Sequence, residues 1–239
     1  MQKFHQELHA ELYGKYPKQL VAVDNVIFGY HDGGLKVLLY PRSFEPAKGN
    51  WSLLGGFLQT DESSDDAAAR IVQITTGLND LYMEQVQVFA QPKREENTRV
   101  ISIVYYSLIR LAKYDDSLLK QYGAEWFALN ELPDLIFDHA EMIDLSLTRL
   151  RQKASIKLMG SELLADCFTI SQLRRLYEGI YNKEFDAGNF RKKVLSLGVL
   201  VRLDKKDFDE SKKGAYYYRY EEDDENDNEK EIIKVINFI

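Results

Sequence analysis

The stretch of sequence that decides the fold is GGFLQTDESSDDAAARIVQITTGL, residues 55–78. A glycine pair closes an apolar run, a polar loop follows, and a helix-forming segment leads to Gly77. In that segment Ala67, Ile71 and Ile74 are spaced i, i+4 and i+7, so they share one face of a helix. The stretch predicts a loop, a helix whose apolar face packs on a sheet, and a second loop.

The polar residues of this stretch resemble the Nudix box, a motif of diphosphate hydrolases written G-x5-E-x7-R-E-U-x-E-E-x-G-U, with U aliphatic. Its register is matched by Gly56, Glu62, Arg70, Gly77 and Leu78. A spacing of this kind also arises by chance, because short motifs carry a false-positive risk. The rest of the chain makes chance the weaker explanation.

Three acidic positions of the motif are missing from this chain. They read Ile71, Ile74 and Thr75. Magnesium is a hard cation that needs oxygen ligands, and an aliphatic side chain can neither hold it nor position an attacking water. Glu62 is left without the carboxylates that would share the ion. The sequence therefore predicts a binding domain with no catalytic residues, no metal site and no cofactor.

Length and composition restrict the number of domains and the class of protein. A chain of 239 residues fits one large domain or two ordinary ones, and 45% hydrophobic residues are enough for packed cores. No apolar run is long enough to span a bilayer, and the first residues lack the layout of a signal peptide. We therefore expect a cytoplasmic protein with no membrane partner. The single cysteine, Cys167, cannot form an intramolecular disulfide and is expected to be a buried, inert thiol.

The chain up to residue 154 mixes strand-like runs with two helices. This pattern predicts an α/β sandwich, a mixed sheet with flanking helices, and the resemblance of the box implies that it is Nudix-like. One helix is the segment within residues 55–78, and the other is expected at 138–153. The strand-like runs cover residues 21–30, 35–42, 49–58, 83–92, 100–111 and 124–133.

After that point the chain changes character and predicts a second domain. Thr169 and Gln172 form a capping-box pair at the start of a helix. Asp186 is a good N-cap for a second helix, which Gly198 can end in the left-handed conformation. Two short helices joined in this way are typical of a helix-turn-helix.

Charge separates this second domain from the rest. The whole chain carries a net charge of −7, but residues 168–219 hold twelve Lys and Arg against seven Asp and Glu, which is +5. Within that segment, residues 199–206 and 215–220 predict a two-stranded wing. A basic helix-turn-helix and wing favour binding to double-stranded DNA over an ordinary solvated helix face. The acidic tract 221–231 is expected to be a solvated loop before a last strand at 232–239.

Eight polar residues of this segment are the candidates for DNA contact. At about 100° per residue, Phe190, Val194 and Leu197 share one stripe of the second helix, and polar residues cluster beside it. That polar stripe is expected to enter a groove of the duplex, while lysines at the wing tip suit phosphates. The candidates are Arg174, Asn189, Arg191, Lys192, Lys193, Ser196, Lys212 and Lys213.

A pocket in the first domain is predicted from unusual residues in its strands. Asp24 is a carboxylate inside an otherwise apolar strand, which burial disfavours unless something pairs it. A ligand hydroxyl and a neighbouring arginine are both open as its partner. Asn25 lies on the opposite face of the same strand. Trp51, Phe57 and Trp126 can stack on an apolar ring face, although such residues more often pack in a core.

The pocket also draws on a helix start and on cations. Asp138 is positioned to cap the helix at 138–153, and His139 is open to three roles: ligand contact, domain-interface switch or structural residue. His5 and His9 have a metal-compatible spacing but no third ligand. Four cations flank strand ends near the box, where they can bind a phosphate or sugar hydroxyls or simply remain solvated. They are Arg42, Lys93, Arg94 and Arg99.

Several segments together are similar to the Nudix-related transcriptional regulators, a bacterial family that joins a Nudix-like domain to a winged helix. They are WSLLGGFL, the altered box, TRVISIVYYSL, AEWFALNELPDLIFDHAEMI and FTISQLRRLYEGIYNKEFDAGNFRKKVLSLG. The resemblance covers nearly the whole chain and implies an effector-binding domain at residues 1–154 and a DNA-binding winged helix at 155–239. It also implies a homodimeric repressor that leaves operator DNA when a small-molecule effector fills the Nudix-like pocket.

The resemblance implies two candidate effectors. Members of the family are associated with ADP-ribose in the control of NAD metabolism, and a branch in gut-type bacteria is tied to pentose sugar use, notably L-arabinose. This chain departs from the family pattern at Leu54, where proline is common, and at the three missing acids. A nucleotide diphosphate normally favours a metal or a stronger cationic cradle. We therefore expect a repressor of L-arabinose utilisation genes first, an ADP-ribose-responsive regulator second, and a divergent Nudix hydrolase using Glu62 third.

Overall fold

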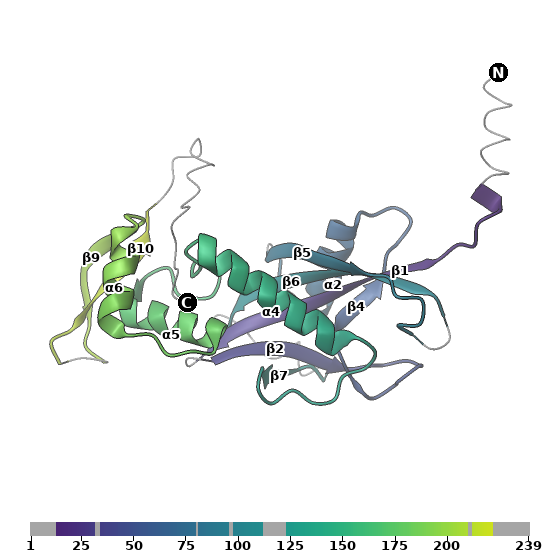
Figure 1. Ribbon diagram of the computed structural model, residues 1–239, viewed down its shortest axis with the longest axis horizontal. Helices are drawn as coiled ribbons and strands as arrows, with labels where there is room; N and C mark the ends of the chain where they lie inside the picture. The colour runs from purple at the N-terminus through teal and green to yellow at the C-terminus, as the bar shows by residue number, and fades with distance from the viewer. Residues whose placement is uncertain are drawn as a thin grey trace, which may run out of the picture.

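The computed structural model describes residues 13–31, 34–79, 81–95, 98–111, 123–209 and 212–221. These residues form two lobes that lie end to end along the long axis of the molecule (Figure 1). The N-terminal lobe is a sheet with a helix on each face, and the C-terminal lobe combines two helices with a small sheet. The structure does not describe His5 and His9, most of the acidic tract or the predicted strand at 232–239.

Seven described strands form the N-terminal sheet, in the order β3-β2-β1-β6-β5, with β4 paired to β1 and β7 paired to β2. The elements of this lobe are β1 (Leu20–His31), β2 (Gly34–Pro41), β3 (Trp51–Ser52), β4 (Leu54–Phe57), α2 (Ser64–Thr76), β5 (Tyr82–Phe89), β6 (Val100–Arg110), β7 (Glu125–Ala128) and α4 (His139–Ile156). β1 runs antiparallel to β2 and parallel to β6, where Leu20 lies opposite Val100 and Tyr30 opposite Arg110. This is the mixed sheet that the sequence predicts.

The sheet is buried on both faces, which explains the nearly continuous apolar run of β1. Val26 and Phe28 belong to the core cluster that includes side chains of α4. Val23 and Ile27 alternate with them along the strand and pack in a second cluster that includes side chains of α2. By the same alternation Asp24 faces the α4 side and Asn25 the α2 side. Figure 1 shows α4 in front of the sheet and α2 behind it.

Both ends of α2 carry the expected signals, but one predicted core residue lies outside its core. Ser63 accepts a hydrogen bond from the Asp66 backbone N–H and completes a capping box, and Gly77 ends the helix in the left-handed conformation at φ 73°. The prediction that Ile74 packs on the sheet is wrong, because its side chain is 54% exposed. The buried residues include both Ala67 and Ala68, so the buried face is turned away from Ile74.

The C-terminal lobe has the helices and the wing that the sequence predicts. Its elements are β8 (Phe168–Thr169), α5 (Ile170–Tyr181), α6 (Ala187–Ser196), β9 (Leu200–Asp207) and β10 (Ala215–Tyr220), with the sheet order β8-β10-β9. The capping box of α5 is confirmed, because Thr169 Oγ1 accepts from the Gln172 N–H at 3.1 Å. Asp186 caps α6 by accepting from the Asn189 N–H at 2.8 Å. Gly198 has φ 74°, the left-handed conformation expected after α6.

The two lobes are joined by apolar packing and by polar contacts. One apolar cluster includes Leu39 of β2 as well as Leu173 of α5. Arg110, at the end of β6, pairs with Asp166 at 2.9 Å in the segment that leads into α5. The predicted domain division between residues 154 and 155 falls within the last turn of α4 and stays a prediction. None of the helices in the described ranges combines the length and the apolar character that a membrane crossing needs.

Candidate effector site and nucleic-acid interface

A buried ionic cluster lies where α4 begins, and Arg94 is at its centre. We define the ionic cluster as Asp24, Arg94, Glu95 and Asp138. The Arg94 guanidinium binds Asp138 through two bonds, Nε to Oδ2 at 2.9 Å and Nη2 to Oδ1 at 2.7 Å. Its Nη1 donates to Glu95 Oε1 at 3.0 Å, and its Nη2 lies 4.0 Å from Asp24 Oδ2. The Arg94 side chain is only 2% exposed, so these pairs lie largely out of solvent.

Asp24 is held in the cluster by its neighbours in the sheet. Ser102 Oγ on β6 donates to Asp24 Oδ2 at 2.5 Å. On the other side, Gly55 of β4 lies opposite Asp24, and a Cβ at that position would overlap the Asp24 carboxylate. Gly55, which precedes the box glycine Gly56, therefore makes room for this side chain. Since a carboxylate can accept about four hydrogen bonds, Asp24 retains capacity for a ligand hydroxyl.

The cluster holds more negative charge than Arg94 can neutralise. Burial raises the pKa of Glu95, although Arg94 and Arg42 act in the opposite direction. Burial alone would lower the pKa of Arg94, but the hydrogen bonds and the charge of Asp138 outweigh it and raise that pKa. Arg42 lies with its guanidinium 4.0 Å from the centre of the Phe44 ring and 5.3 Å from that of Phe137. The site is therefore rich in acceptors and contains a firmly ionised cation.

His139 follows Asp138 and has a structural contact. Its Nδ1 accepts a hydrogen bond from the Leu53 N–H at 3.0 Å, which places the ring proton on Nε2. Burial lowers the pKa of His139, in agreement with a neutral ring. Asp138 stands at the N-cap position but makes no side-chain cap. The predicted capping role of Asp138 is wrong because its carboxylate is taken by Arg94.

The other predicted pocket residues are spread over the lobe. Asn25 is fully buried on the α2 side, and both of its amide atoms lack a hydrogen-bond partner among the described residues. Trp51 packs edge-on against Phe127, with ring centres 4.8 Å apart. Phe57 is 47% exposed. The remaining three are the exposed Lys93, the half-buried Arg99 and the partly buried Trp126, which packs against the core on the α2 side.

The structure thus brings together Asp24, Arg94 and Asp138 from the predicted set and adds Glu95 and Ser102 to them. Nothing in the sequence favours Arg94 over the other three candidate cations. Glu95 and Ser102 were missed. Ser102 carries a faint signal, because it is a polar residue between Val100 and Val104 in a buried strand. Glu95 lies in a polar loop and carries none.

The altered Nudix box keeps its framework contacts. Arg70 binds Glu62 through Nε at 2.8 Å and Nη2 at 2.7 Å. The Gln59 N–H also donates to Glu62 at 2.8 Å, so this carboxylate organises the loop before α2. Thr75, at a missing acid position, donates back to the Ile71 carbonyl at 2.7 Å. Over the described ranges, no group of three His, Cys, Asp or Glu side chains is placed to hold a metal ion.

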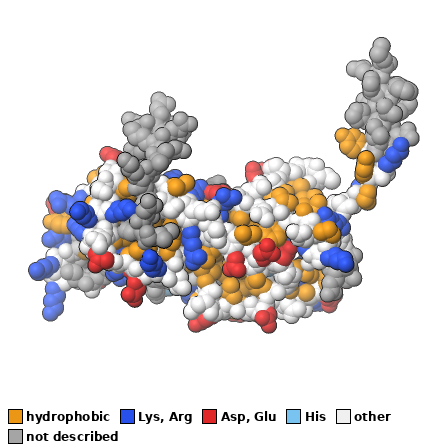
Figure 2. Space-filling model, in the orientation of Figure 1, with side chains coloured by type: hydrophobic (Ala, Val, Ile, Leu, Met, Phe, Trp, Pro, Cys, Tyr) orange, Lys and Arg blue, Asp and Glu red, His pale blue; other side chains and the backbone are white. Residues whose placement is uncertain are grey.

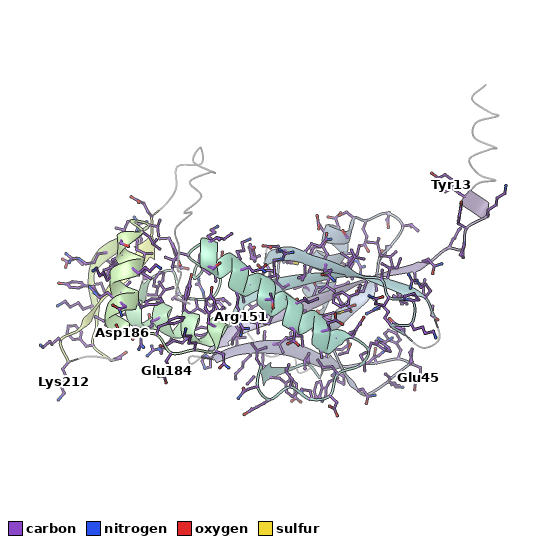
Figure 3. All side chains as sticks on the ribbon, in the orientation of Figure 1. Tyr13, Glu45, Arg151, Glu184, Asp186 and Lys212 are labelled. Carbon is purple, nitrogen blue, oxygen red and sulfur yellow. The ribbon has the colours of Figure 1, made fainter. Side chains whose placement is uncertain are left out.

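A basic face covers the far end of the C-terminal lobe. We define the basic face as five exposed residues: Asn189, Lys192 and Ser196 on α6, and Lys212 and Lys213 at the wing tip. Phe190 and Val194 are the buried residues of α6. Figure 2 shows blue side chains gathered at this end of the molecule, and Figure 3 labels Lys212 at its edge.

The three remaining candidates for DNA contact have interactions within the protein. Arg174 donates to Glu178 at 2.8 Å and to the Phe185 carbonyl at 3.1 Å, and its role in DNA contact stays a prediction. Arg191 donates to the Tyr218 hydroxyl at 3.3 Å while remaining exposed. Lys193 is half-buried. Arg202 and Lys206, which are not among the candidates, each place their charged group 4.6 Å from the centre of the Tyr216 ring.

Comparisons with known proteins match both lobes. A family model described as NUDIX domain matches residues 18–145, and one described as NrtR DNA-binding winged helix domain matches residues 160–220. The chain is similar to the ADPR responsive transcriptional repressor NtrR of Acinetobacter baylyi, with 30% identity over 86% of this chain and 83% of the relative. It is also similar to the ADP-ribose pyrophosphatase of Methanocaldococcus jannaschii, with 36% identity over 55% of this chain and 75% of that enzyme.

A solved structure resembles both lobes at once. Shewanella oneidensis NrtR in complex with a 27mer DNA superposes with a TM-score of 0.75 and 29% identity, over 84% of this chain and 93% of that one. The likeness therefore includes the order of the two lobes as well as their separate folds. The chain belongs to the NrtR family of Nudix-related transcriptional regulators.

Proposed function

We propose that this protein is a transcriptional repressor whose affinity for operator DNA is set by a small molecule bound at the ionic cluster. The observation that carries the proposal is the presence, on one chain, of a largely buried polar cluster and an exposed basic face. α6 enters the major groove, and the wing lysines bind phosphates. The protein acts as a homodimer, because paired recognition helices read half-sites about 34 Å apart.

We propose ADP-ribose as the effector. The repressor of Acinetobacter baylyi is described as ADPR responsive, and the enzyme of Methanocaldococcus jannaschii is an ADP-ribose pyrophosphatase. These relatives support the second expectation from the sequence, and none of them supports L-arabinose. Asp24 and Asp138 offer acceptors for ribose hydroxyls, while Arg42, whose charge acts on Glu95, offers a cation for a diphosphate.

A free pentose is the second candidate, and one observation favours it. Three carboxylates surround Arg94 in the ionic cluster, which suits the hydroxyls of a neutral sugar better than a dianionic diphosphate. The two candidates share the chemistry of a pentose ring held by acceptors. They differ in whether the adjoining site must also bind phosphate.

We also propose that the protein does not hydrolyse its effector. The three missing acids leave Glu62 as the remaining box carboxylate, and Arg70 occupies it. Incubation with ADP-ribose and Mg²⁺ should release no AMP above the background rate. Efficient release would make the protein a hydrolase and overturn this part of the proposal.

The test is fluorescence anisotropy on DNA from the region upstream of the protein's own gene, at fixed salt. Titration with ADP-ribose should release the DNA. A separate titration with L-arabinose tests the second candidate effector. Release of the DNA by L-arabinose alone would identify the free sugar, and not ADP-ribose, as the effector. Lack of DNA binding under every condition would overturn it.

Two variants test separately whether the basic face binds DNA and whether the ionic cluster binds the effector. Lys212→Ala combined with Lys213→Ala should weaken DNA binding while effector binding in calorimetry is unchanged. Ser102→Ala removes the hydroxyl that binds Asp24 and should weaken effector binding alone. Lys18→Ala, an exposed lysine before β1, is the matched control for the loss of a positive charge.

A further inference from the structure

A single helix connects the ionic cluster to the C-terminal lobe. α4 begins next to Asp138, whose carboxylate binds Arg94. Arg151 lies thirteen residues after Asp138, which is about 20 Å along the helix at roughly 1.5 Å per residue. Figure 3 labels Arg151 on the part of α4 that lies beside the C-terminal lobe. One rigid element therefore touches both the candidate effector site and the lobe with the basic face.

Arg151 makes a two-way contact with the end of α5. Its Nε donates to the Ile180 carbonyl at 2.8 Å. In return, the Tyr181 hydroxyl donates to the Arg151 carbonyl at 2.8 Å. The last carbonyls of a helix have no partner within the helix, and a cation there is favourable because the end of the helix is partly negative. The contact fixes where α5 ends against α4.

The space beside this contact is open. A cleft of about 560 Å³ lies between the lobes, lined by Leu35 and Arg151 on one side and by Glu178, Gly179 and Asn182 on the other. The contact between Arg151 and α5 therefore lies at the edge of an unfilled part of the lobe junction.

We propose that Arg151 is the positioning residue through which effector binding at the ionic cluster reaches the DNA-binding lobe. This inference rests on the proposed function. An effector that engages Asp138 competes with Arg94 for that carboxylate and shifts the first turn of α4. α4 passes the shift to Arg151, and Arg151 passes it to α5 and hence to α6. Since linkage is reciprocal, bound DNA must alter effector affinity by the same factor.

The test compares coupling with binding. For each variant, DNA affinity is measured by anisotropy without and with saturating ADP-ribose, and with L-arabinose as the second probe. The ratio of the two dissociation constants is the coupling factor, and such factors are typically about 5- to 150-fold. In Arg151→Met this factor should fall to within about twofold of one, while calorimetry still detects binding of the effector and anisotropy still detects binding of DNA.

Three further variants make the result specific to the contact. Arg151→Lys keeps one donor for the Ile180 carbonyl and should restore part of the coupling factor. Tyr181→Phe keeps the ring but removes the hydroxyl, so it should also lower the factor, and it decides the question if Arg151→Met does not fold. Lys153→Met is the matched control, because Lys153 sits on the same helix and pairs with Glu84 within the N-terminal lobe at 2.5 Å. It should leave the coupling factor unchanged.

The possible failures are distinct. If Arg151→Met and Tyr181→Phe keep the wild-type factor, this inference is overturned and the proposed function stands. If the Lys153→Met control loses the factor as fully as Arg151→Met, the effect is a general weakening of α4 and the inference is also overturned. If the DNA affinity of the wild-type protein is the same without effector, with ADP-ribose and with L-arabinose, the proposed function itself fails.

Discussion

The ionic cluster and the basic face hold their charged side chains in opposite ways. In the cluster, Arg94 is almost fully buried and bound to Asp138 and Glu95. On the basic face, Lys192, Lys212 and Lys213 are exposed to solvent. Buried pairs are hardly screened by salt, whereas exposed lysines are screened strongly and release counterions when they bind phosphate. One region is organised before a ligand arrives, and the other acquires its partners from the ligand.

The largest expected effect comes from breaking the cluster at Arg94. Arg94→Met should lower the free energy of unfolding by about 3–5 kcal/mol, because it leaves buried carboxylates without their cation. Urea denaturation followed by circular dichroism measures the loss. Lys93→Met, at the exposed neighbouring position, should change stability by no more than about 0.5 kcal/mol. Equal urea midpoints for the two variants would show that Arg94 does not hold the cluster together.

Substitutions in the basic face should change the salt dependence of DNA binding and leave the stability to urea unchanged. Lys192→Ala should weaken DNA binding and reduce the slope of log affinity against log salt by about 0.9, the value for one lost phosphate contact on duplex DNA. Its urea midpoint should match that of the wild-type protein. Lys18→Ala again serves as the control. An unchanged slope in Lys192→Ala would remove this lysine from the interface.

His139, which follows Asp138 of the ionic cluster, should make stability depend on pH. Burial depresses the pKa of His139 in the folded state below its unfolded value of about 6.5, so the unfolded chain binds the proton first. Stability is thus unaffected by this group above about pH 6.5 and falls below it, by at most about 1.4 kcal/mol per pH unit. Urea midpoints at pH 7.5 and 5.5 measure the fall. His139→Gln should reduce it, and an equal fall in that variant would assign the pH dependence to other groups.

The smallest effect is expected at the altered box. Ile74→Glu restores one acid at an exposed position and should change stability by no more than about 0.5 kcal/mol. Ile71→Glu places an acid in the core and should cost several times more, because a buried charge without a partner is unfavourable. Thermal melts of the two variants provide the comparison. Similar losses would mean that the two positions are equally buried.

Much of the fold could be predicted because its signals are local. Thr169 and Gln172 cap α5 from three residues apart, and Asp186 caps α6 in the same way. Alternation along β1 placed Asp24 and Asn25 on opposite faces. Each of these depends on neighbours in the chain, where backbone geometry fixes the distance.

The candidate site was predicted less well because its contacts are distant in sequence. Asp24 meets Ser102 across 78 positions, and Arg94 meets Asp138 across 44. Only the sheet order brings them together, so no spacing rule could select Arg94 from its neighbours or show that it would take the Asp138 carboxylate away from the helix start. Arg174 is a similar case, since its partner Phe185 lies beyond the end of its own helix.

The parallel pairing of β1 with β6 has a consequence for how such chains can change in length. Asp24 and Ser102 lie near one end of this pair, and Tyr30 and Arg110 lie opposite each other at the other end. A residue gained or lost within either strand would turn every following side chain to the opposite face of the sheet. One such change would alter the position of Asp24 and Ser102 relative to Tyr30 and Arg110. We therefore expect the loops to tolerate insertions and deletions that these two strands do not.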